Sequence, residues 1–227
     1  MGIVEIIFWI SISLIIYSTI IYLILLNLFR NNNYVVDEDY LPTITLIICA
    51  YNEEKNILNK FKNVEDLEYP MEKMQVILSD DGSDDRTVEI AKSFNFVNVL
   101  SLDRSGKTSA QNEAVKIAEN DILVFSDANS IYHPNAIKKL ARNFADKRVG
   151  VVCGELRYHE EKSEESIYWN YEIAIKKGES RNGWLIGANG SIYAVRRESY
   201  VPLPKDAISD HLEPIKVYGN GLDIIYE

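Results

Sequence analysis

Short apolar runs alternate with amphipathic segments along residues 43–145, and this pattern predicts strands and helices in turn. Continuous apolar runs predict strands at residues 43–50, 75–79, 97–101 and 121–125. Apolar positions at helical spacing predict helices at residues 54–67, 85–94, 108–119 and 134–145, the last with Pro134 in its first turn. Strands that alternate with helices favour a mainly parallel central sheet, so the predicted fold class is α/β.

The alternation loosens after Val149. The pattern there predicts a strand at residues 149–158, an aromatic-rich helix at 166–177 and a strand at 190–196. We expect this half to shape the site of a second substrate. Trp169, with Tyr168 and Tyr171, suits a platform on which a sugar stacks, although aromatic residues at helical spacing are also typical of a core.

The N-terminal segment has a different pattern, because residues 3–29 are almost wholly apolar and Glu5 is their only charge. This length exceeds the roughly 20 residues that cross about 30 Å of hydrocarbon, so residues 3–29 are predicted to form a transmembrane helix. A cleaved signal peptide is the alternative. It is disfavoured because the segment has no basic n-region, is too long and has no small-residue cleavage site.

Residues 30–42 are predicted to be a polar linker, and residues 43–227 a single catalytic domain. Arg30 follows the apolar segment directly, while no Lys or Arg precedes it. The positive-inside tendency therefore predicts a single-pass membrane protein whose catalytic domain faces the cytoplasm.

Composition excludes one class of partner. The formal net charge is -10, whereas nucleic-acid binding needs clustered Lys and Arg, so no nucleic acid is expected to bind. Cys49 and Cys153 each lie inside a predicted strand without a metal-ligand partner nearby in sequence. Both are predicted to be reduced core residues.

Acidic residues follow two of the predicted strands. Asp80 and Asp81 come directly after residues 75–79, and Asp127 with Asn129 comes after residues 121–125. Ligands of open α/β sheets bind beyond the carboxyl ends of the strands, so we expect these acids to converge on one pocket that holds a metal or a proton donor. Capping of the next helix accounts for Asp84 or Asp85 but not for the two earlier acids.

Two other nucleotide or phosphate sites are disfavoured. A receiver-type signalling domain would carry its acid pair on the first strand, whereas here the pair follows the second. The segment from Ser101 to Thr108 misses the P-loop pattern by one residue, and Asp103 would place a negative charge in the phosphate cradle. Lys107, near a predicted helix N-terminus, remains a candidate contact for a diphosphate.

Four segments, in order, resemble the family 2 glycosyltransferases, which are inverting enzymes of the GT-A fold that use nucleotide-sugar donors. The segments are Ile47 to Glu54, Asp80-Asp81-Gly82-Ser83, Gly106-Lys107 with Gln111-Asn112-Glu113-Ala114, and Asp127-Ala128-Asn129. They are similar, in turn, to the family's first-strand motif, its nucleotide-binding acids, its loop and helix, and its D-x-D motif. Downstream, residues 187–197 resemble the strand beside the acceptor site, and residues 208–214 resemble the segment that carries the catalytic base.

The resemblance implies a GT-A fold and a role for each matching residue. Asp210 stands at the position of the general base, and Ser209 stands where an acid usually precedes it. The implied nucleotide-sugar-binding residues are Ala50, Tyr51, Glu53, Asp80, Asp81, Lys107 and Asp127. The implied ligands of a Mg²⁺ or Mn²⁺ ion are Asp127 and Asn129, with His211, expected in a loop, as an extra ligand. Gly187, Asn189 and Trp169 are placed on the acceptor side.

The expected function is transfer of a sugar, from a UDP-sugar or similar donor, to a glycan or lipid-linked acceptor at the membrane. Two departures from the family pattern are evident. Asn129 replaces the second aspartate of D-x-D, and the sequence ends at Glu227, before any Gln-x-x-Arg-Trp element. The C-terminal end of the domain is therefore expected to be incomplete, unless this member does without that element. The alternative function is that of a non-catalytic, glycosyltransferase-like membrane partner subunit.

Overall fold

The computed structural model describes residues 2–28, 32–157 and 164–227. These fall into two compact units, one formed by Met1–Asn33 with Arg157–Leu185 and the other by Tyr34–Leu156 with Ile186–Glu227. The segment 157–185, assigned to the catalytic domain from the sequence, thus groups with the N-terminal helix, and the predicted boundaries 3–29, 30–42 and 43–227 stay predictions. Arg30, on which the predicted orientation in the membrane rests, lies outside the described residues.

The first unit is helical. Helix α1 (Ile3–Ile16), a π-helical stretch (Tyr17–Ile21) and helix α2 (Tyr22–Leu28) follow one another without a break. Together they form a 26-residue helix, Ile3–Leu28, that is long and apolar enough to cross a membrane. Helix α7 (Glu164–Asn182) covers and extends the predicted helix 166–177.

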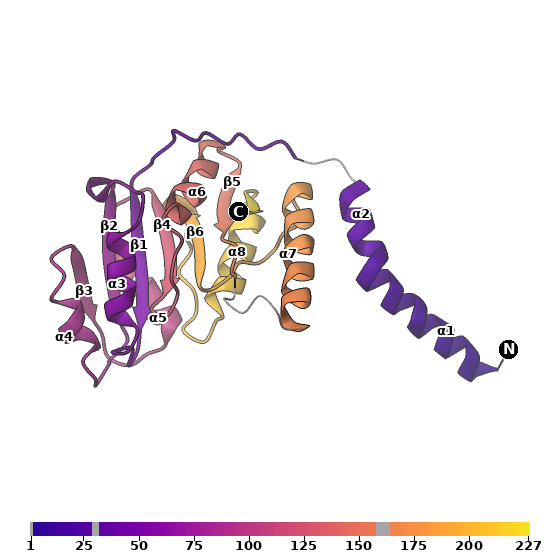
Figure 1. Ribbon diagram of the computed structural model, residues 1–227, viewed down its shortest axis with the longest axis horizontal. Helices are drawn as coiled ribbons and strands as arrows, with labels where there is room; N and C mark the ends of the chain where they lie inside the picture. The colour runs from indigo at the N-terminus through magenta and orange to yellow at the C-terminus, as the bar shows by residue number, and fades with distance from the viewer. Residues whose placement is uncertain (1, 29–31, 158–163) are drawn as a thin grey trace. The chain divides into compact units, whose positions relative to one another are not determined.

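The second unit contains a seven-stranded sheet (Figure 1) in the order β3-β2-β1-β4-β6-β5-β7. The strands are β1 (Ile44–Ala50), β2 (Met74–Asp80), β3 (Val97–Ser101), β4 (Ile122–Asp127), β5 (Val149–Cys153), β6 (Ile192–Arg196) and β7 (Asp223–Tyr226). Strands β1 to β4 are mutually parallel, β6 runs antiparallel to β4 and β5, and β7 is parallel to β5. The predicted mainly parallel α/β sheet is confirmed.

Helices of this unit connect the strands and are mostly shorter than predicted. They are α3 (Ile57–Glu65), α4 (Thr87–Ala91), α5 (Lys107–Lys116), α6 (Ala136–Arg142) and α8 (Ser209–Gly219), with 3-10 turns at Met71–Lys73, Asn143–Ala145 and Arg197–Ser199. Strand β5 ends at Cys153 instead of continuing toward Tyr158, which is itself outside the described residues. Helix α8 and strand β7 were not predicted.

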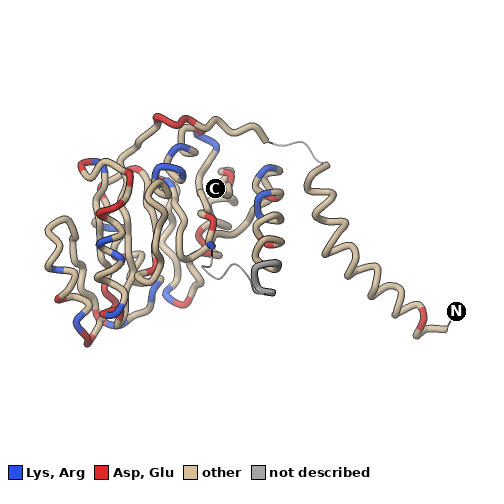
Figure 2. The backbone as a smooth tube through the Cα atoms, viewed as in Figure 1, with Lys and Arg blue, Asp and Glu red and all other residues tan. Residues whose placement is uncertain are grey.

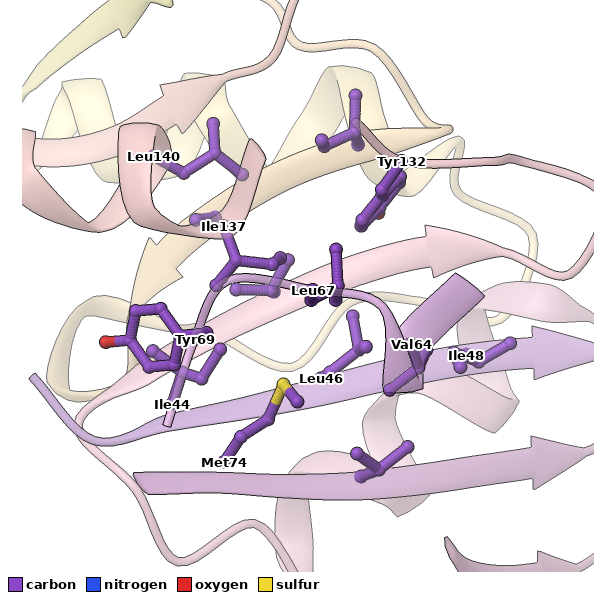
Figure 3. Close-up of a cluster of buried hydrophobic side chains, with 14 of the residues drawn as sticks. Ile44, Leu46, Ile48, Val64, Leu67, Tyr69, Met74, Tyr132, Ile137 and Leu140 are labelled. Carbon is purple, nitrogen blue, oxygen red and sulfur yellow. The ribbon is translucent and has the colours of Figure 1, made fainter. Parts of the chain in front are cut away.

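The core beside β1 shows why the apolar runs form strands. Side chains alternate along a strand, so Ile44, Leu46 and Ile48 share one face of β1. On that face they join a buried cluster (Figure 3) with Met74 of β2 and residues of α3, α6 and nearby loops. The other residues of the cluster that Figure 3 labels are Val64, Leu67, Tyr69, Tyr132, Ile137 and Leu140. Each fully buried aliphatic side chain contributes about 1.5–3 kcal/mol, which stabilises β1 as an interior strand of the sheet.

The two cysteines occupy the predicted strands, Cys49 in β1 and Cys153 in β5, and both are thiols in the described part of the chain. Burial raises the pKa of the Cys49 thiol to about 12, with the nearby carboxylates acting in the same direction and Lys107 against it. A thiol with so high a pKa holds almost no thiolate at neutral pH, so Cys49 is unreactive.

Candidate active site

The carboxyl ends of β1, β2 and β4 bring the predicted acids to one edge of the sheet. In the parallel register, Ala50 of β1 lies beside Asp80 of β2, and Cys49 lies beside Asp127 of β4. Strands β2 and β4 flank β1, so Asp80 and Asp127 are separated by a single strand. The two strand-end acids thus lie at one edge of the sheet as expected, and the prediction that they line one pocket stays a prediction.

The Asp81 carboxylate is already hydrogen-bonded, because the loop that follows β3 closes around it. Its side chain accepts hydrogen bonds from the backbone N–H groups of Ser105, at 2.7 Å, and Gly106, at 2.9–3.0 Å. The guanidinium of Arg104 completes the shell through an ion pair. That guanidinium also lies 3.5 Å from the centre of the Tyr51 ring, on its face. Asp81 therefore holds a half-exposed Arg104–Tyr51 stack at the edge of the sheet.

Gly82 makes this approach of two loops possible. Its φ of +79° is disfavoured for other residues, and a Cβ there would lie 2.9 Å from the backbone nitrogen of Arg104. Sequence reasoning missed Arg104, because it tested residues 101–108 only as a phosphate loop. The signal that could have found it is an arginine in a loop after a strand, one strand away from a buried acid.

Asp80 has a local partner that sequence reasoning did not anticipate. Its carboxylate accepts hydrogen bonds from the backbone N–H, at 3.1 Å, and the hydroxyl of Ser83, so it closes the turn after β2. Ser83 in turn accepts a bond from the backbone of Asn52, at 2.9 Å. The turn after β2 thereby fixes the loop after β1, and the predicted contact of Asp80 with a nucleoside stays a prediction.

Neither Asp84 nor Asp85 is the N-cap of α4, because Arg86 takes that position and makes no side-chain cap bond, but Asp85 bonds the start of the helix from one residue earlier. Its Oδ1 accepts the backbone N–H of Thr87 at 2.9 Å, and its Oδ2 accepts the backbone N–H of Glu54 at 3.0 Å. Thr87 uses its hydroxyl to accept the backbone N–H of Glu53 at 2.8 Å. These bonds hold residues 53 and 54 in a turn, which is why α3 begins at Ile57 and not at residue 54.

Lys107 and Asp127 form an ion pair in the middle of the site, with 2.5 Å between Nζ and Oδ1. Lys107 is the first residue of α5, a ten-residue helix, so its backbone lies at the positive end of the helix dipole. The other oxygen of Asp127 accepts a bond from the hydroxyl of Ser191, at 3.3 Å. The N-terminal end of α5, the Lys107 ammonium and the Asp127 carboxylate therefore lie together, so an anion and a cation can bind there side by side.

The residues present fit a divalent ion that takes most of its coordinating oxygens from a bound diphosphate and from water. Asp127 offers one half-buried carboxylate, and Asn129 lies exposed in the turn that follows β4. Among the described residues, no group of three or more His, Cys, Asp and Glu side chains could hold a metal. Mg²⁺ is often bound by one or two carboxylates together with phosphate oxygens and water, which is what this donor set allows.

Asp210 lies on the same site from the other side. It is in the first turn of α8, where a negative charge interacts favourably with the helix dipole. A Cβ on Gly190 would lie 2.6 Å from Oδ2 of Asp210, so the carboxylate rests against the bare glycine backbone. Ser191, next in the chain, contacts Asp127. Consecutive residues therefore contact the predicted base and the predicted metal ligand.

Pro214 explains how α8 is fastened to this segment. A proline lacks the N–H that would bond the carbonyl four residues earlier, and that carbonyl belongs to Asp210. The freed oxygen accepts the backbone N–H of Ala188 instead, at 3.1 Å. Pro214 makes α8 hard to predict, and the carbonyl that it frees ties Ala188 to Asp210.

Gly187 and Asn189, which are predicted to be on the acceptor side, belong to this segment. The side-chain amide of Asn189 donates to the carbonyl of Gly154 at 2.7 Å. A Cβ on Gly187 would lie 3.5 Å from Nδ1 of His211. The expectation that His211 lies in a loop is wrong, because α8 begins two residues earlier; its role as a metal ligand stays a prediction. Trp169 belongs to the first unit, and its acceptor-side role also stays a prediction.

Replacing Gly190 by Ala tests the contact with Asp210. Because the new methyl group would overlap the carboxylate, Asp210 must move, and we expect the turnover number to fall about tenfold or more. Donor affinity should change little. Gly219→Ala is the matched control, since a Cβ there meets nothing within 4 Å. Steady-state kinetics of both variants check this, and equal turnover by wild type and Gly190→Ala would contradict it.

Lys60 is buried under the turn that carries Asp127 and Asn129. Its Nζ donates to the carbonyl of Ser130 at 2.7 Å and lies 3.8 Å from the centre of the Tyr132 ring. Burial lowers its pKa to about 7, although Asp127 acts in the opposite direction. Sequence reasoning took the helix containing Lys60 as ordinary and missed this support, because lysine is rarely buried.

Glu213 is a second buried ionisable residue, one turn beyond Asp210 in α8. It is fully buried, and its Oε1 accepts only a long bond, 3.3 Å, from the backbone of Val201. In the described part of the chain its Oε2 has no hydrogen-bond partner. Burial raises its pKa to about 7, against the Val201 bond and the charge of Lys216. Near neutral pH the side chain is therefore partly protonated.

This raised pKa predicts a pH dependence of stability. Between about pH 4.5 and 7 the folded state keeps a proton that the unfolded state releases, so the free energy of unfolding falls as pH rises. The loss is about 3 kcal/mol if the shift is fully expressed. Glu213→Gln removes the titration. Denaturant unfolding should show the variant gaining stability relative to wild type across this window, and a constant difference at all pH values would contradict the assignment.

Comparisons with known proteins identify the family. Residues 45–201 match the model of Glycosyl transferase family 2, which covers more than half of the chain. The chain belongs to this family. A poly-beta-1,6-N-acetyl-D-glucosamine synthase of Staphylococcus aureus is 33% identical over 133 residues, covering 56% of this chain and 32% of that protein. Glycosyltransferase AglE of Haloferax volcanii is 28% identical over 123 residues, covering 52% and 40%.

This family 2 chain also shares its fold with solved structures. The mannosyltransferase PcManGT from Pyrobaculum calidifontis, in complex with GDP-Man and Mn²⁺, superposes with a TM-score of 0.83 and 23% identity, covering 96% of this chain and 65% of that one. TarS 1-349 of S. aureus, in complex with UDP-GlcNAc, gives 0.64 and 19%, covering 82% and 56%. The predicted GT-A fold is confirmed. The chain spans about a third of the S. aureus synthase and two fifths of AglE.

Proposed function

We propose that this chain transfers a sugar from a nucleoside diphosphate sugar to a glycan or lipid-linked acceptor at a membrane, with inversion at the anomeric carbon. The observation that carries the proposal is the contact of consecutive residues, Gly190 and Ser191, with Asp210 and Asp127. A base and a diphosphate-binding carboxylate then flank one reaction centre. The named donors of the solved relatives support a nucleotide-sugar donor, and we favour a UDP-sugar.

Donor binding is assigned to the edge formed by β1, β2 and β4. Asp81 holds Arg104 against Tyr51, and this half-exposed stack offers a flat face and hydrogen-bond donors to a nucleoside base. Ala50, the last residue of β1, and Glu53, in the loop that follows, lie on either side of Tyr51 in the chain. Lys107 would exchange its ion pair with Asp127 for the diphosphate, which carries more negative charge than one carboxylate.

In the proposed reaction, Asp210 takes the proton from the acceptor hydroxyl as that oxygen bonds to the anomeric carbon. The bond from the anomeric carbon to the diphosphate breaks, and its electron pair leaves with the nucleoside diphosphate. A divalent cation held by Asp127 and Asn129 would neutralise this leaving charge. Lys107 adds a second positive charge, and Ser191 orients the carboxylate of Asp127.

The chain's apolar helix, Ile3–Leu28, is proposed to anchor the protein in the membrane as a single span, with the catalytic unit on the cytoplasmic side. An anchored enzyme samples acceptors at the membrane surface. This favours acceptors that are themselves lipid-linked or that grow at the membrane. The anchor and the acceptor class are supported by hydropathy and by the polysaccharide synthases among the relatives.

A thermal-shift panel of nucleoside diphosphates and nucleotide sugars, with and without Mn²⁺, tests the proposal. Binding to the folded state stabilises it by RT ln(1 + [L]/Kd), so a ligand at 100 times its Kd adds about 2.7 kcal/mol. We expect one base to dominate and Mn²⁺ to increase its effect. Inorganic diphosphate alone is the control for the nucleoside contribution. Binding without any release of nucleoside diphosphate from the donor in Mn²⁺ would instead favour a non-catalytic partner subunit.

A further inference from the structure

Tyr132 lies in the loop that follows β4, shortly after Asp127 and Asn129. Its ring belongs to the buried cluster beside β1 (Figure 3), and only 5% of its surface is exposed. Its hydroxyl donates to the carbonyl of Ser191, at 3.1 Å. Burial raises the pKa of this hydroxyl, while a hydrogen bond with Ser126 acts against the rise. Tyr132 therefore keeps its proton and remains a donor at neutral pH.

Ser191 is bound by both ends of this loop. Its hydroxyl donates to Oδ2 of Asp127, at 3.3 Å, and its carbonyl accepts the bond from Tyr132. The residue before it is Gly190, against which the carboxylate of Asp210 rests. A shift of Ser191 would therefore disturb the surroundings of both functional carboxylates.

Helix α3 holds the same loop through Lys60 and Asn63, whose spacing places them on one face of the helix. Nζ of Lys60 donates to the carbonyl of Ser130, at 2.7 Å, and lies 3.8 Å from the centre of the Tyr132 ring. The amide of Asn63 donates to the carbonyl of Tyr132 at 2.8 Å and accepts its backbone N–H at 2.7 Å. Both the ring and the main chain of Tyr132 are thereby fixed.

The burial of Lys60 indicates that the contact of α3 with this loop is specific. Helix α3, which shows blue segments in Figure 2, contains two lysines, Lys60 and Lys62. Lys62 is exposed, as is usual for lysine, whereas Lys60 is fully buried. A buried amine is unfavourable without partners, and its partners here are a loop carbonyl and the Tyr132 ring. An apolar side chain at this position could pack α3 but could not hold the loop.

We propose that Tyr132 is a positioning residue for sugar transfer, which through Ser191 sets the separation between the carboxylates of Asp127 and Asp210. The proposal rests on the function proposed above and adds a buried residue that acts through another. The two carboxylates must serve one donor and one acceptor at the same time. A displacement of about 1 Å is enough to slow such a reaction strongly.

Replacing Tyr132 by Phe tests the proposal, because it removes the hydroxyl and keeps the ring. Tyr69→Phe is the matched control. Tyr69 is equally buried in the same cluster, and its hydroxyl also donates to a backbone carbonyl, that of Pro42, before the opposite end of β1. Each variant loses one buried hydrogen bond, so we expect similar decreases in the melting temperature of the metal-free protein.

The two variants should differ at the site. Mn²⁺ binding is measured by EPR of the free ion, without acceptor, at a saturating concentration of the nucleoside diphosphate that binds best in the panel above. We expect Tyr132→Phe to bind Mn²⁺ about threefold to tenfold more weakly than wild type. At saturating Mn²⁺ its turnover of the matching nucleotide sugar should be about tenfold lower. Tyr69→Phe should match wild type in both measurements.

Ser191→Ala shows whether Tyr132 acts through Ser191. Without the Ser191 hydroxyl, Tyr132 no longer reaches Asp127, so the double variant should bind Mn²⁺ about as well as the weaker of the two single variants. Additive losses would overturn the proposal. Asn63→Ala, which frees the main chain of Tyr132 and leaves its ring, is a second variant with the same expected direction, and it replaces Tyr132→Phe if that variant does not fold.

The outcomes separate this proposal from the proposed function. Wild-type Mn²⁺ binding and turnover in Tyr132→Phe would overturn the positioning role. Equal losses in Tyr132→Phe and Tyr69→Phe would also overturn it, because they would show a role in packing alone. If wild type neither binds Mn²⁺ with the nucleoside diphosphate nor releases that diphosphate from the donor, the proposed function fails, and this proposal fails with it.

Discussion

Replacing Asp210 by Asn is expected to lower the rate of sugar transfer by about 10²–10⁴-fold while donor affinity stays close to that of wild type. Asn has nearly the same size, so it can rest against Gly190 as the carboxylate does, but it cannot accept a proton from the acceptor hydroxyl. The loss should therefore appear in the turnover number. Single-turnover transfer assays, with nucleotide binding measured separately by calorimetry, give the two quantities.

The matched control for this variant is Asp206→Asn. Asp206 is exposed four residues earlier in the same segment, so its substitution changes the net charge equally without touching Gly190. We expect near wild-type transfer. If Asp210→Asn and Asp206→Asn both transfer sugar at the wild-type rate, Asp210 is not the base, and the assignment must move to another group near Ser191.

Replacing Asp127 by Asn removes the last carboxylate of the D-x-N motif. Without it, a divalent ion would depend on amide oxygens and on the diphosphate, so we expect kcat/KM to fall about 100-fold, equivalent to about 3 kcal/mol of transition-state stabilisation. A higher Mn²⁺ concentration should be needed for half-maximal activity. Titration of Mn²⁺ at saturating donor measures both effects.

Asp121→Asn is the control at the opposite end of the same strand region, where the side chain is exposed and distant from the motif. It should leave the Mn²⁺ dependence unchanged. A second comparison is Lys107→Met, which removes the ion-pair partner of Asp127 and should weaken diphosphate binding without raising the Mn²⁺ requirement. Wild-type Mn²⁺ dependence in Asp127→Asn would show that this carboxylate holds no metal.

The strands that carry the site could be predicted because their burial shows in the local sequence as continuous apolar runs. The apolar runs ending at Ala50, Asp80 and Asp127 are buried on both faces, so composition alone marks them as central parallel strands. Their acids then had to share one edge of the sheet. The resemblance to the family added Asp210, which lies more than 80 residues beyond Asp127 in the chain.

The parts that could not be predicted depend on tertiary contacts. Helix α8 contains Pro214, which argues against a helix unless another group satisfies the freed carbonyl of Asp210, and Ala188 does so. Arg104 matters only because Asp81 and Tyr51 meet it in space. Lys60 and Glu213 look like surface residues in sequence, and only the packing of α3 and α8 buries them.

The most direct test of the account is release of nucleoside diphosphate from a nucleotide sugar in the presence of Mn²⁺, by the full chain in liposomes with a lipid-linked or glycan acceptor. The account predicts release by wild type, loss of release in Asp210→Asn, and retained donor binding in that variant. Absence of release by wild type from every nucleotide sugar tested, in the presence of Mn²⁺, would contradict it.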